Sequence, residues 1–227
     1  MDAIRWLTLN QRSKLFFRRP FKYSYSRITL LLIAVNCLVF ALSYFFMDMY
    51  QYLHYYGALN AYLVEYNHFY WQFITYMFLH QNISHLFFNM VGLLIFGLSL
   101  ERAIGSKEFL LFYLITGTLS GVFSFLVFKF TGQYRVFLIG ASGAIYAVLF
   151  AYAVFFPRSI IYVWGIIPLP APLMVVLYAV IELGSQFFSS DNVAHLTHLF
   201  GFLSAWLYFV IRMGIHPVKV WKNTYRK

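Results

Sequence analysis

The chain has 227 residues, of which 62% are hydrophobic and only 11% are charged. Soluble domains carry about 25% charged residues, so this composition excludes an ordinary soluble protein. Together with a mean hydropathy of +0.70, it indicates one polytopic membrane domain. The formal net charge of +10 does not indicate a nucleic-acid partner, because the positive residues lie beside the apolar stretches and orient them. The single cysteine, Cys37, excludes an intrachain disulfide.

Residues 1–27 form a basic and aromatic segment. It contains seven Lys and Arg residues, interleaved with apolar residues such as Trp6 and Phe16. Two interpretations remain open. The segment lies at an anionic membrane surface, or it is a partly disordered cytoplasmic tail whose charges orient the first span.

Six apolar stretches follow, and a hydrocarbon core of about 30 Å needs roughly 20 helical residues to cross it. We place them near residues 28–46, 82–100, 108–128, 142–156, 170–188 and 193–211. The predicted fold is an all-α polytopic membrane protein, a bundle of six transmembrane helices whose short fourth helix starts inside the membrane. The first loop, residues 47–81, is rich in Tyr, His and Trp and lacks Lys and Arg. We therefore expect it to be half-embedded at the membrane interface.

The distribution of Lys and Arg predicts the orientation of these spans. With the N-terminus inside, the inside segments hold fifteen of the seventeen Lys and Arg residues, and the outside segments hold only Lys129 and Arg135. The positive-inside rule then places both termini in the cytoplasm. The predicted organisation is a cytoplasmic or interfacial segment 1–27, a membrane domain 28–211 and a basic cytoplasmic tail 212–227.

Polar residues inside spans are costly and usually functional. The fourth helix, from Ser142 to the break at Pro157, is roughly 22 Å long at 1.5 Å per residue. It is thus about 8 Å shorter than the hydrocarbon core, so Ser142 lies about 8 Å below the outer face. His198, six residues into the sixth span, lies about 9 Å deep by the same count. Asn89 reaches a similar depth in the second span, and His85 shares its helix face one turn above.

Small residues on the fourth and sixth helices predict a close approach of the two backbones. On the sixth helix, His198, Gly201 and Ala205 share one face. On the fourth helix, the corresponding small residues are Gly140, Gly143 and Ala147. This packing would bring the serine and histidine side chains within hydrogen-bond reach.

These residues predict nucleophilic acyl transfer. A serine needs an adjacent base, which an imidazole provides. We expect His198 to accept the proton of Ser142 and then to donate it to the leaving amine. Candidate donors to the oxyanion are His85, Asn89 and the backbone N–H of Ser142 at a helix N-terminus. No Asp lies in a span to orient His198, so the expected unit is a dyad.

The polar residues also allow other functions. A metal site is the rival use of four histidines, namely His80, His85, His195 and His198, but no H-E-x-x-H motif occurs and carboxylate or cysteine ligands are lacking nearby. Glu182 in the fifth span is part of a proton path, or it is protonated or bonded to Ser185, Gln186 or a neighbouring helix. The rival functions are therefore a non-catalytic protein that binds transmembrane helices and a proton-coupled transporter, although no internal duplication supports the latter.

Three motifs resemble those of the rhomboid intramembrane serine proteases. Gly140-Ala-Ser142-Gly143 resembles the family's G-x-S-G nucleophile motif, and Tyr146 stands where the family commonly has a Tyr that stacks under the catalytic His. The run from His198 to Ala205 is similar to its H-x-x-G-x-x-x-G motif, with Ala205 in place of the last Gly. His85-Leu-Phe-Phe-Asn89 looks like its H-x-x-x-N motif, which is associated with the oxyanion. Glu101-Arg102 also falls where the family tends to carry such residues.

The resemblance implies a six-helix bundle around a water-filled cavity that opens outward, with the fifth helix and the loop 186–193 as a movable gate. It implies an active protease whose substrates are single-span membrane proteins, without a metal or cofactor. A six-span core with inside termini looks like the bacterial form and hence implies a plasma membrane. One departure lies in the first loop, where Trp71-Gln72 replaces the frequent Trp-Arg pair. The sequence leaves the oligomeric state and the role of Gln72 open.

Overall fold

The computed structural model of the chain describes residues 15–163, 165–188 and 192–226. About half of the predicted basic N-terminal segment, residues 1–14, therefore lies outside the described residues. The same holds for residues 189–191, within the loop that was expected to act as part of a gate.

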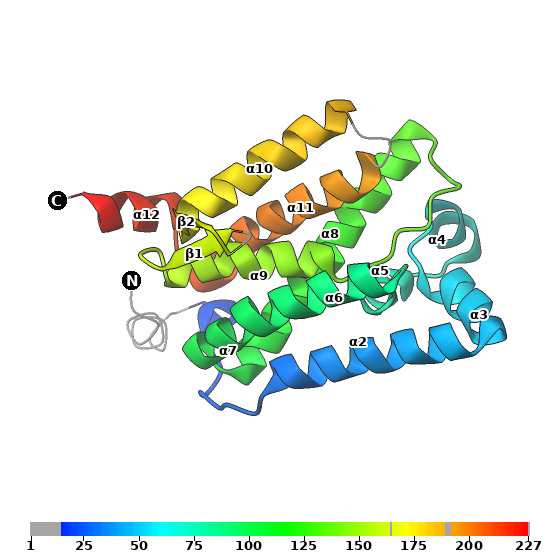
Figure 1. The fold of residues 1–227 in the computed structure, drawn as a ribbon, viewed down its shortest axis with the longest axis horizontal. Coiled ribbons are helices and arrows are strands. Elements are labelled where there is room, and N and C mark those ends of the chain that lie inside the picture. The colour runs from blue at the N-terminus through cyan, green and yellow to red at the C-terminus, as the bar shows by residue number, and fades with distance from the viewer. Residues whose placement is uncertain (1–14, 164, 189–191, 227) are drawn as a thin grey trace.

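In the described part of the chain, apolar helices coincide with the six predicted stretches (Figure 1). They are α2 (Ile28–Phe45), the continuous run of α6 (Ile83–Gly92), η3 (Leu93–Gly97) and α7 (Leu98–Ile104), then α8 (Ser106–Thr131), α9 (Ser142–Phe155), α10 (Ala171–Phe188), and α11 (Asn192–Tyr208) with η4 (Phe209–Met213). Four are long and apolar enough to cross a membrane by length and composition, namely Ile28–Phe45, Ile83–Ile104, Ser106–Thr131 and His195–Met213. The apolar part of α10 is shorter, and α9, the fourth predicted span, has only 14 residues.

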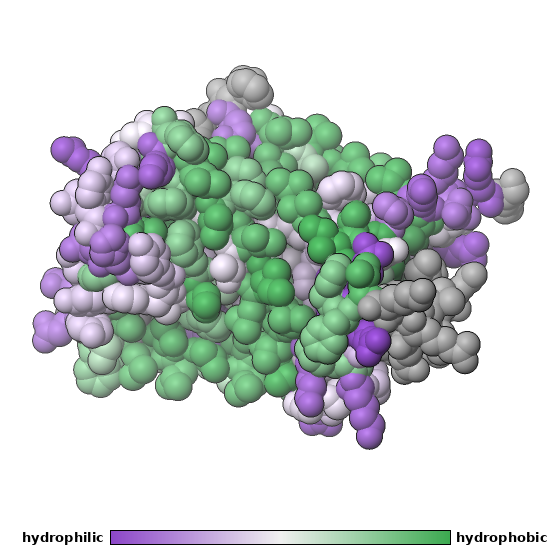
Figure 2. Space-filling model, turned by 180° about the vertical axis from the view of Figure 1, so that it is seen from behind, coloured by the Kyte–Doolittle hydropathy of each residue, from purple (hydrophilic) through white to green (hydrophobic). Residues whose placement is uncertain are grey.

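The first loop folds into short helices rather than an irregular connection. These are α3 (Met47–Gly57), α4 (Ala61–Asn67), α5 (Gln72–Thr75) and η2 (Tyr76–Phe78). They gather at one end of the bundle, whereas the start of α2, the end of α7 and the C-terminal α12 (Pro217–Tyr225) lie at the other (Figure 1). A broad hydrophobic surface lies between two hydrophilic ends (Figure 2).

Gln72 holds the first loop together from the inside. Its side chain is fully buried, its Oε1 accepts a hydrogen bond from the Asn60 N–H (3.1 Å), and its Nε2 donates to the Tyr55 carbonyl (3.2 Å). Asn60 in turn donates to the carbonyl of Val136 (2.9 Å), close to the start of α9. Buried amides need such partners, so Gln72 has a structural role that the sequence left open.

A short β-hairpin adds to the predicted helical fold. Strand β1 (Ile160–Val163) pairs antiparallel with β2 (Ile167–Pro170), and Gly165 between them has a φ of +73°. The hairpin connects α9 to α10 at the same end of the bundle as α12 (Figure 1). The fold is therefore mostly helical rather than purely helical.

Two buried carboxylates fasten the end of the bundle that carries the hairpin. Glu101 on α7 accepts hydrogen bonds from the backbone N–H groups of Ile28 (2.7 Å) and Thr29 (2.9 Å) at the start of α2, and from the hydroxyl of Ser106. These are amides that a helix cannot satisfy by itself. On α8, the buried Glu108 accepts a hydrogen bond from Arg212 (2.7 Å) and so binds η4, which directly follows α11.

Replacing Glu101 by Ala should lower the free energy of unfolding by about 2–4 kcal/mol, because buried donors at the start of α2 lose a charged acceptor. The measurement is the unfolding midpoint of the purified protein in detergent micelles. The control is Glu65→Ala, which breaks a partly exposed ion pair with Lys129 (3.0 Å) and should change stability far less, because water reaches and screens the pair. Equal losses in the two variants would contradict the structural role of Glu101.

Candidate active site

Ser142 is the first residue of α9, and the first loop fixes the segment before it. Leu138 and Leu59 exchange two backbone hydrogen bonds of 2.9 Å, and the Gly140 N–H donates to the Tyr76 carbonyl (3.0 Å). Gly140 has a φ of +122°, which glycine adopts readily because it has no Cβ. The chain thus turns at Gly140 and presents Ser142 at a helix N-terminus, where the first N–H groups have no partner within the helix.

The backbones of α9 and α11 touch at two glycines. A Cβ added to Gly201 would lie 2.3 Å from the carbonyl oxygen of Gly143, and one added to Gly143 would lie 3.0 Å from the Cβ of Ser120 on α8. Ala205, one turn after Gly201, is fully buried. The close approach that the small residues predicted is therefore confirmed.

His198 on α11 is held on its face and at its edge. Its ring stacks on that of Tyr146 from α9, with ring centroids 4.2 Å apart and an interplanar angle of 9°. Its Nδ1 lies 2.9 Å from Oε1 of Glu182 on α10. Among the described residues, Nε2 of His198 has no hydrogen-bond partner and remains available.

His85 and Asn89 lie on α6, beside the segment that leads into α9. The side chain of Asn82 accepts the His85 N–H (2.8 Å) and so starts this helix. Asn89 is buried, and its Nδ2 donates to the His85 carbonyl (3.0 Å). The His85 ring covers Gly140 so closely that a Cβ there would lie 2.7 Å from its Cε1.

One cavity of about 870 Å³ brings the predicted residues together. It is lined by Ser142, His198, His85, Asn89 and Tyr146. It continues along α6 and α10 to β1, which lines its other end. Ser142 and His198 are both described, and no direct hydrogen bond joins them. Such contacts are commonly loose in a free enzyme and tighten with substrate.

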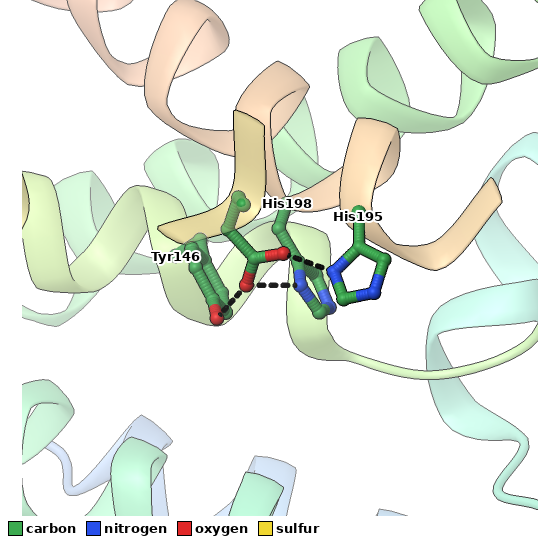
Figure 3. A network of polar contacts seen from close by, with 4 residues as sticks. Tyr146, His195 and His198 are labelled. Carbon is green, nitrogen blue, oxygen red and sulfur yellow. Dashed lines mark hydrogen bonds and ion pairs between the residues drawn. The ribbon is translucent and has the colours of Figure 1, made fainter. Parts of the chain in front are cut away.

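The individual partners of Glu182 were not predicted from the sequence. Its carboxylate is buried. Oε1 accepts a hydrogen bond from the Tyr146 hydroxyl and contacts Nδ1 of His198, and Oε2 contacts Nδ1 of His195 (Figure 3). The expectation that it binds a neighbouring helix is confirmed, since these partners lie on α9 and α11. When the depth count used for Ser142 and His198 is applied to Glu182, it gives the outer third of the fifth span, and this is the signal in the sequence that links Glu182 to His198.

The four histidines considered as metal ligands form two pairs. His80 and His85 have ring centroids 5.1 Å apart, and those of His195 and His198 are 6.4 Å apart. A cluster of a different composition, Glu182 with His195 and His198, has three potential ligand atoms within 4.8 Å of one another. A carboxylate is therefore nearer to the second pair than the sequence indicated.

Comparison with known proteins agrees with this arrangement. The model of the family described as "Rhomboid domain" matches residues 67–214. The chain belongs to the rhomboid family. The matched range contains all three motifs, those of His85, Ser142 and His198. Rhomboid proteins are generally intramembrane serine proteases, although some members are inactive. With the spans described above, this chain is a multi-pass integral membrane protein.

Several rhomboid relatives are similar over part of their length. Rhomboid-related protein 1 of Caenorhabditis elegans is 30% identical over 58% of this chain and 36% of its own length. RHOMBOID-like protein 1 of Arabidopsis thaliana is 28% identical over 66% of this chain and 36% of its own. Rhomboid protease GlpG of Haemophilus influenzae is 32% identical over 54% of this chain and 59% of its own. The chain thus spans between about a third and three fifths of these rhomboid relatives.

Gly201→Ala should destabilise this rhomboid protein by about 1–3 kcal/mol, because the added methyl group collides with the Gly143 carbonyl and forces α9 and α11 apart. The matched control is Gly184→Ala on α10, where nothing lies within 4 Å of the added Cβ. The control should be neutral or slightly stabilising, because Ala favours the helix more than Gly does. Unfolding midpoints in detergent compare the two, and a tolerant Gly201→Ala variant would contradict the backbone contact.

Proposed function

We propose that this rhomboid-family protein is an intramembrane serine endopeptidase that uses Ser142 as nucleophile and His198 as base. The supporting observation is that both side chains line one cavity, with the His198 ring held against Tyr146 and its Nε2 free of other partners among the residues that the structure describes. An activated serine requires this combination of a hydroxyl, a nearby imidazole and a group that orients the imidazole.

The reaction follows from the roles of these groups. Ser142 Oγ attacks the scissile carbonyl carbon while Nε2 of His198 takes the hydroxyl proton. The tetrahedral intermediate then collapses, the C–N bond breaks, and His198 gives the proton to the leaving amine. Water, deprotonated in turn by His198, hydrolyses the acyl-enzyme and restores Ser142.

The oxyanion forms beside three donors in this proposal. The backbone N–H of Ser142 lies at the N-terminus of α9, where the helix dipole favours negative charge. His85 packs against the adjacent Gly140, and Asn89 presents a second amide hydrogen besides the one bound to the His85 carbonyl. Preorganised donors of this kind stabilise charge that develops only in the transition state.

The proposed substrates are single-span membrane proteins. The cavity is largely apolar and extends along α6 and α10, which suits a transmembrane segment more than a soluble peptide. In an intact helix the carbonyl oxygens are hydrogen-bonded and the backbone is covered by side chains. Cleavage is therefore expected where the substrate helix unwinds readily. We further propose that both termini lie in the cytoplasm, because the Lys and Arg residues favour that side, and that Ser142 lies nearer to the outer face of a bacterial plasma membrane.

Ser142→Ala should lower cleavage of a single-span reporter with a helix-breaking segment by at least about 10³-fold, because no other group replaces the nucleophile. A fluorophosphonate probe should label wild-type Ser142 and should label it much more slowly in His198→Ala. The control is Ser99→Ala on α7, outside the cavity, which should behave as the wild type. Full cleavage by Ser142→Ala would exclude the protease assignment and favour a protein that only binds transmembrane helices.

Asn89→Ala should reduce kcat for the reporter by about 10²- to 10³-fold with little change in KM, because the lost donor acts mainly in the transition state. Steady-state kinetics in detergent micelles separate the two parameters. A rise in KM at constant kcat would instead place Asn89 in substrate binding and contradict its role toward the oxyanion.

A further inference from the structure

Glu182 is a buried carboxylate in the second half of α10, with only 5% of its surface exposed. It is the shared acceptor of three side chains from two other helices, Tyr146 on α9 and His195 and His198 on α11 (Figure 3). A buried carboxylate is strongly unfavourable unless donors surround it. Here the Tyr146 hydroxyl and one ring nitrogen of each histidine surround its two oxygens, as an ionised carboxylate requires.

From this geometry we infer that Glu182 is a positioning residue, which orients His198 through Nδ1 and so completes a Ser142–His198–Glu182 triad. The inference rests on the proposed function, because it assigns Glu182 a task in the same reaction. It goes beyond the dyad that the sequence predicted, in which no acidic residue orients the base.

The hydrogen bonds determine which nitrogen of His198 is the base. An ionised carboxylate only accepts hydrogen bonds, so Nδ1 of His198 (2.9 Å) carries the hydrogen. In a neutral imidazole the other nitrogen then holds the lone pair. Nε2 is thereby the base, and Nδ1 would compete for that task if the carboxylate were absent.

The same carboxylate also fixes the plane of the ring. Tyr146 stacks under His198 at 4.2 Å and donates its hydroxyl to the oxygen of Glu182 that His198 contacts. The ring is held at its edge by the acceptor and on its face by the tyrosine. A hydrogen bond that served only to hold α10 and α11 together would not need to involve Nδ1 of His198, the proposed base.

A metal-binding role for the cluster is less compatible with its dimensions. Tetrahedral ligands about 2.0–2.1 Å from zinc stand roughly 3.3 Å apart. One Glu182 oxygen lies 2.9 Å from Nδ1 of His198, a normal hydrogen-bond distance, and the other contacts Nδ1 of His195 more closely still. The two Glu182–histidine contacts are therefore those of direct hydrogen bonds and not of ligands on either side of a cation.

The test measures kcat/KM for the single-span reporter against pH in wild type, Glu182→Gln and Glu182→Asp. Glu182→Gln should lose at least about tenfold in activity, because an amide neither fixes the tautomer nor stabilises the imidazolium. The acidic limb of the plot of kcat/KM against pH should move to lower pH in Glu182→Gln. Glu182→Asp, which keeps the charge, should recover part of the activity. The titratable groups that face Glu182 and His198 are Tyr146 from α9, Tyr178 from α10, His195 from α11 and His85 from α6.

Controls separate this inference from the proposed function. Leu183→Ala, an exposed neighbour on α10, should leave activity and the pH profile unchanged. If wild-type Ser142 is not labelled by the fluorophosphonate, the proposed function fails whatever the Glu182 variants do. If Ser142 is labelled in wild type and Glu182→Gln retains both its kcat/KM and its pH profile, the triad is wrong. Loss of wild-type activity on chelation, restored by Zn²⁺, would also overturn it.

Discussion

Where Gly201 of α11 meets the carbonyl oxygen of Gly143 on α9, the two helix backbones lie so close that no side chain fits at Gly201. This contact sets the distance between the residue that opens α9 and the histidine one turn before Gly201. It also places Tyr146, one turn into α9, directly under the His198 ring. Small residues are how membrane helices reach such distances, because lipid provides no hydrophobic force to press them together. The geometry of the candidate active site therefore depends on Gly143 and Gly201 having no side chain.

Much of the fold could be predicted because membrane helices follow from hydropathy and length. The described apolar helices begin and end near the predicted spans, and the short fourth helix is present in α9. The relation between Ser142 and His198 could also be predicted, since depth in a membrane is a one-dimensional count along each helix. That count gives the level of a side chain but not its direction around the helix axis.

The contacts of Glu182 show what this count leaves out. Met174, Tyr178 and Glu182 are four residues apart on α10, and the first two line the cavity, but only the packing of three helices decides that this face turns toward His198. Gln72 was equally beyond prediction, because its partners belong to a loop whose folding depends on buried hydrogen bonds. The β-hairpin is different. Its β-branched run around Gly165 carried a strand signal, which the hydropathy of the neighbouring spans concealed.

Glu101 has a consequence for how the protein is made. It accepts the amides of Ile28 and Thr29 across 73 and 72 residues of chain. A ribosome produces helices in order, so α2 is complete long before its acceptor exists. Its first amides must remain hydrated at the membrane surface until the run from α6 to α7 has been synthesised and has returned to the same side. The start of α2 therefore reaches its final position only after membrane insertion, when Glu101 on α7 becomes available to accept its amides.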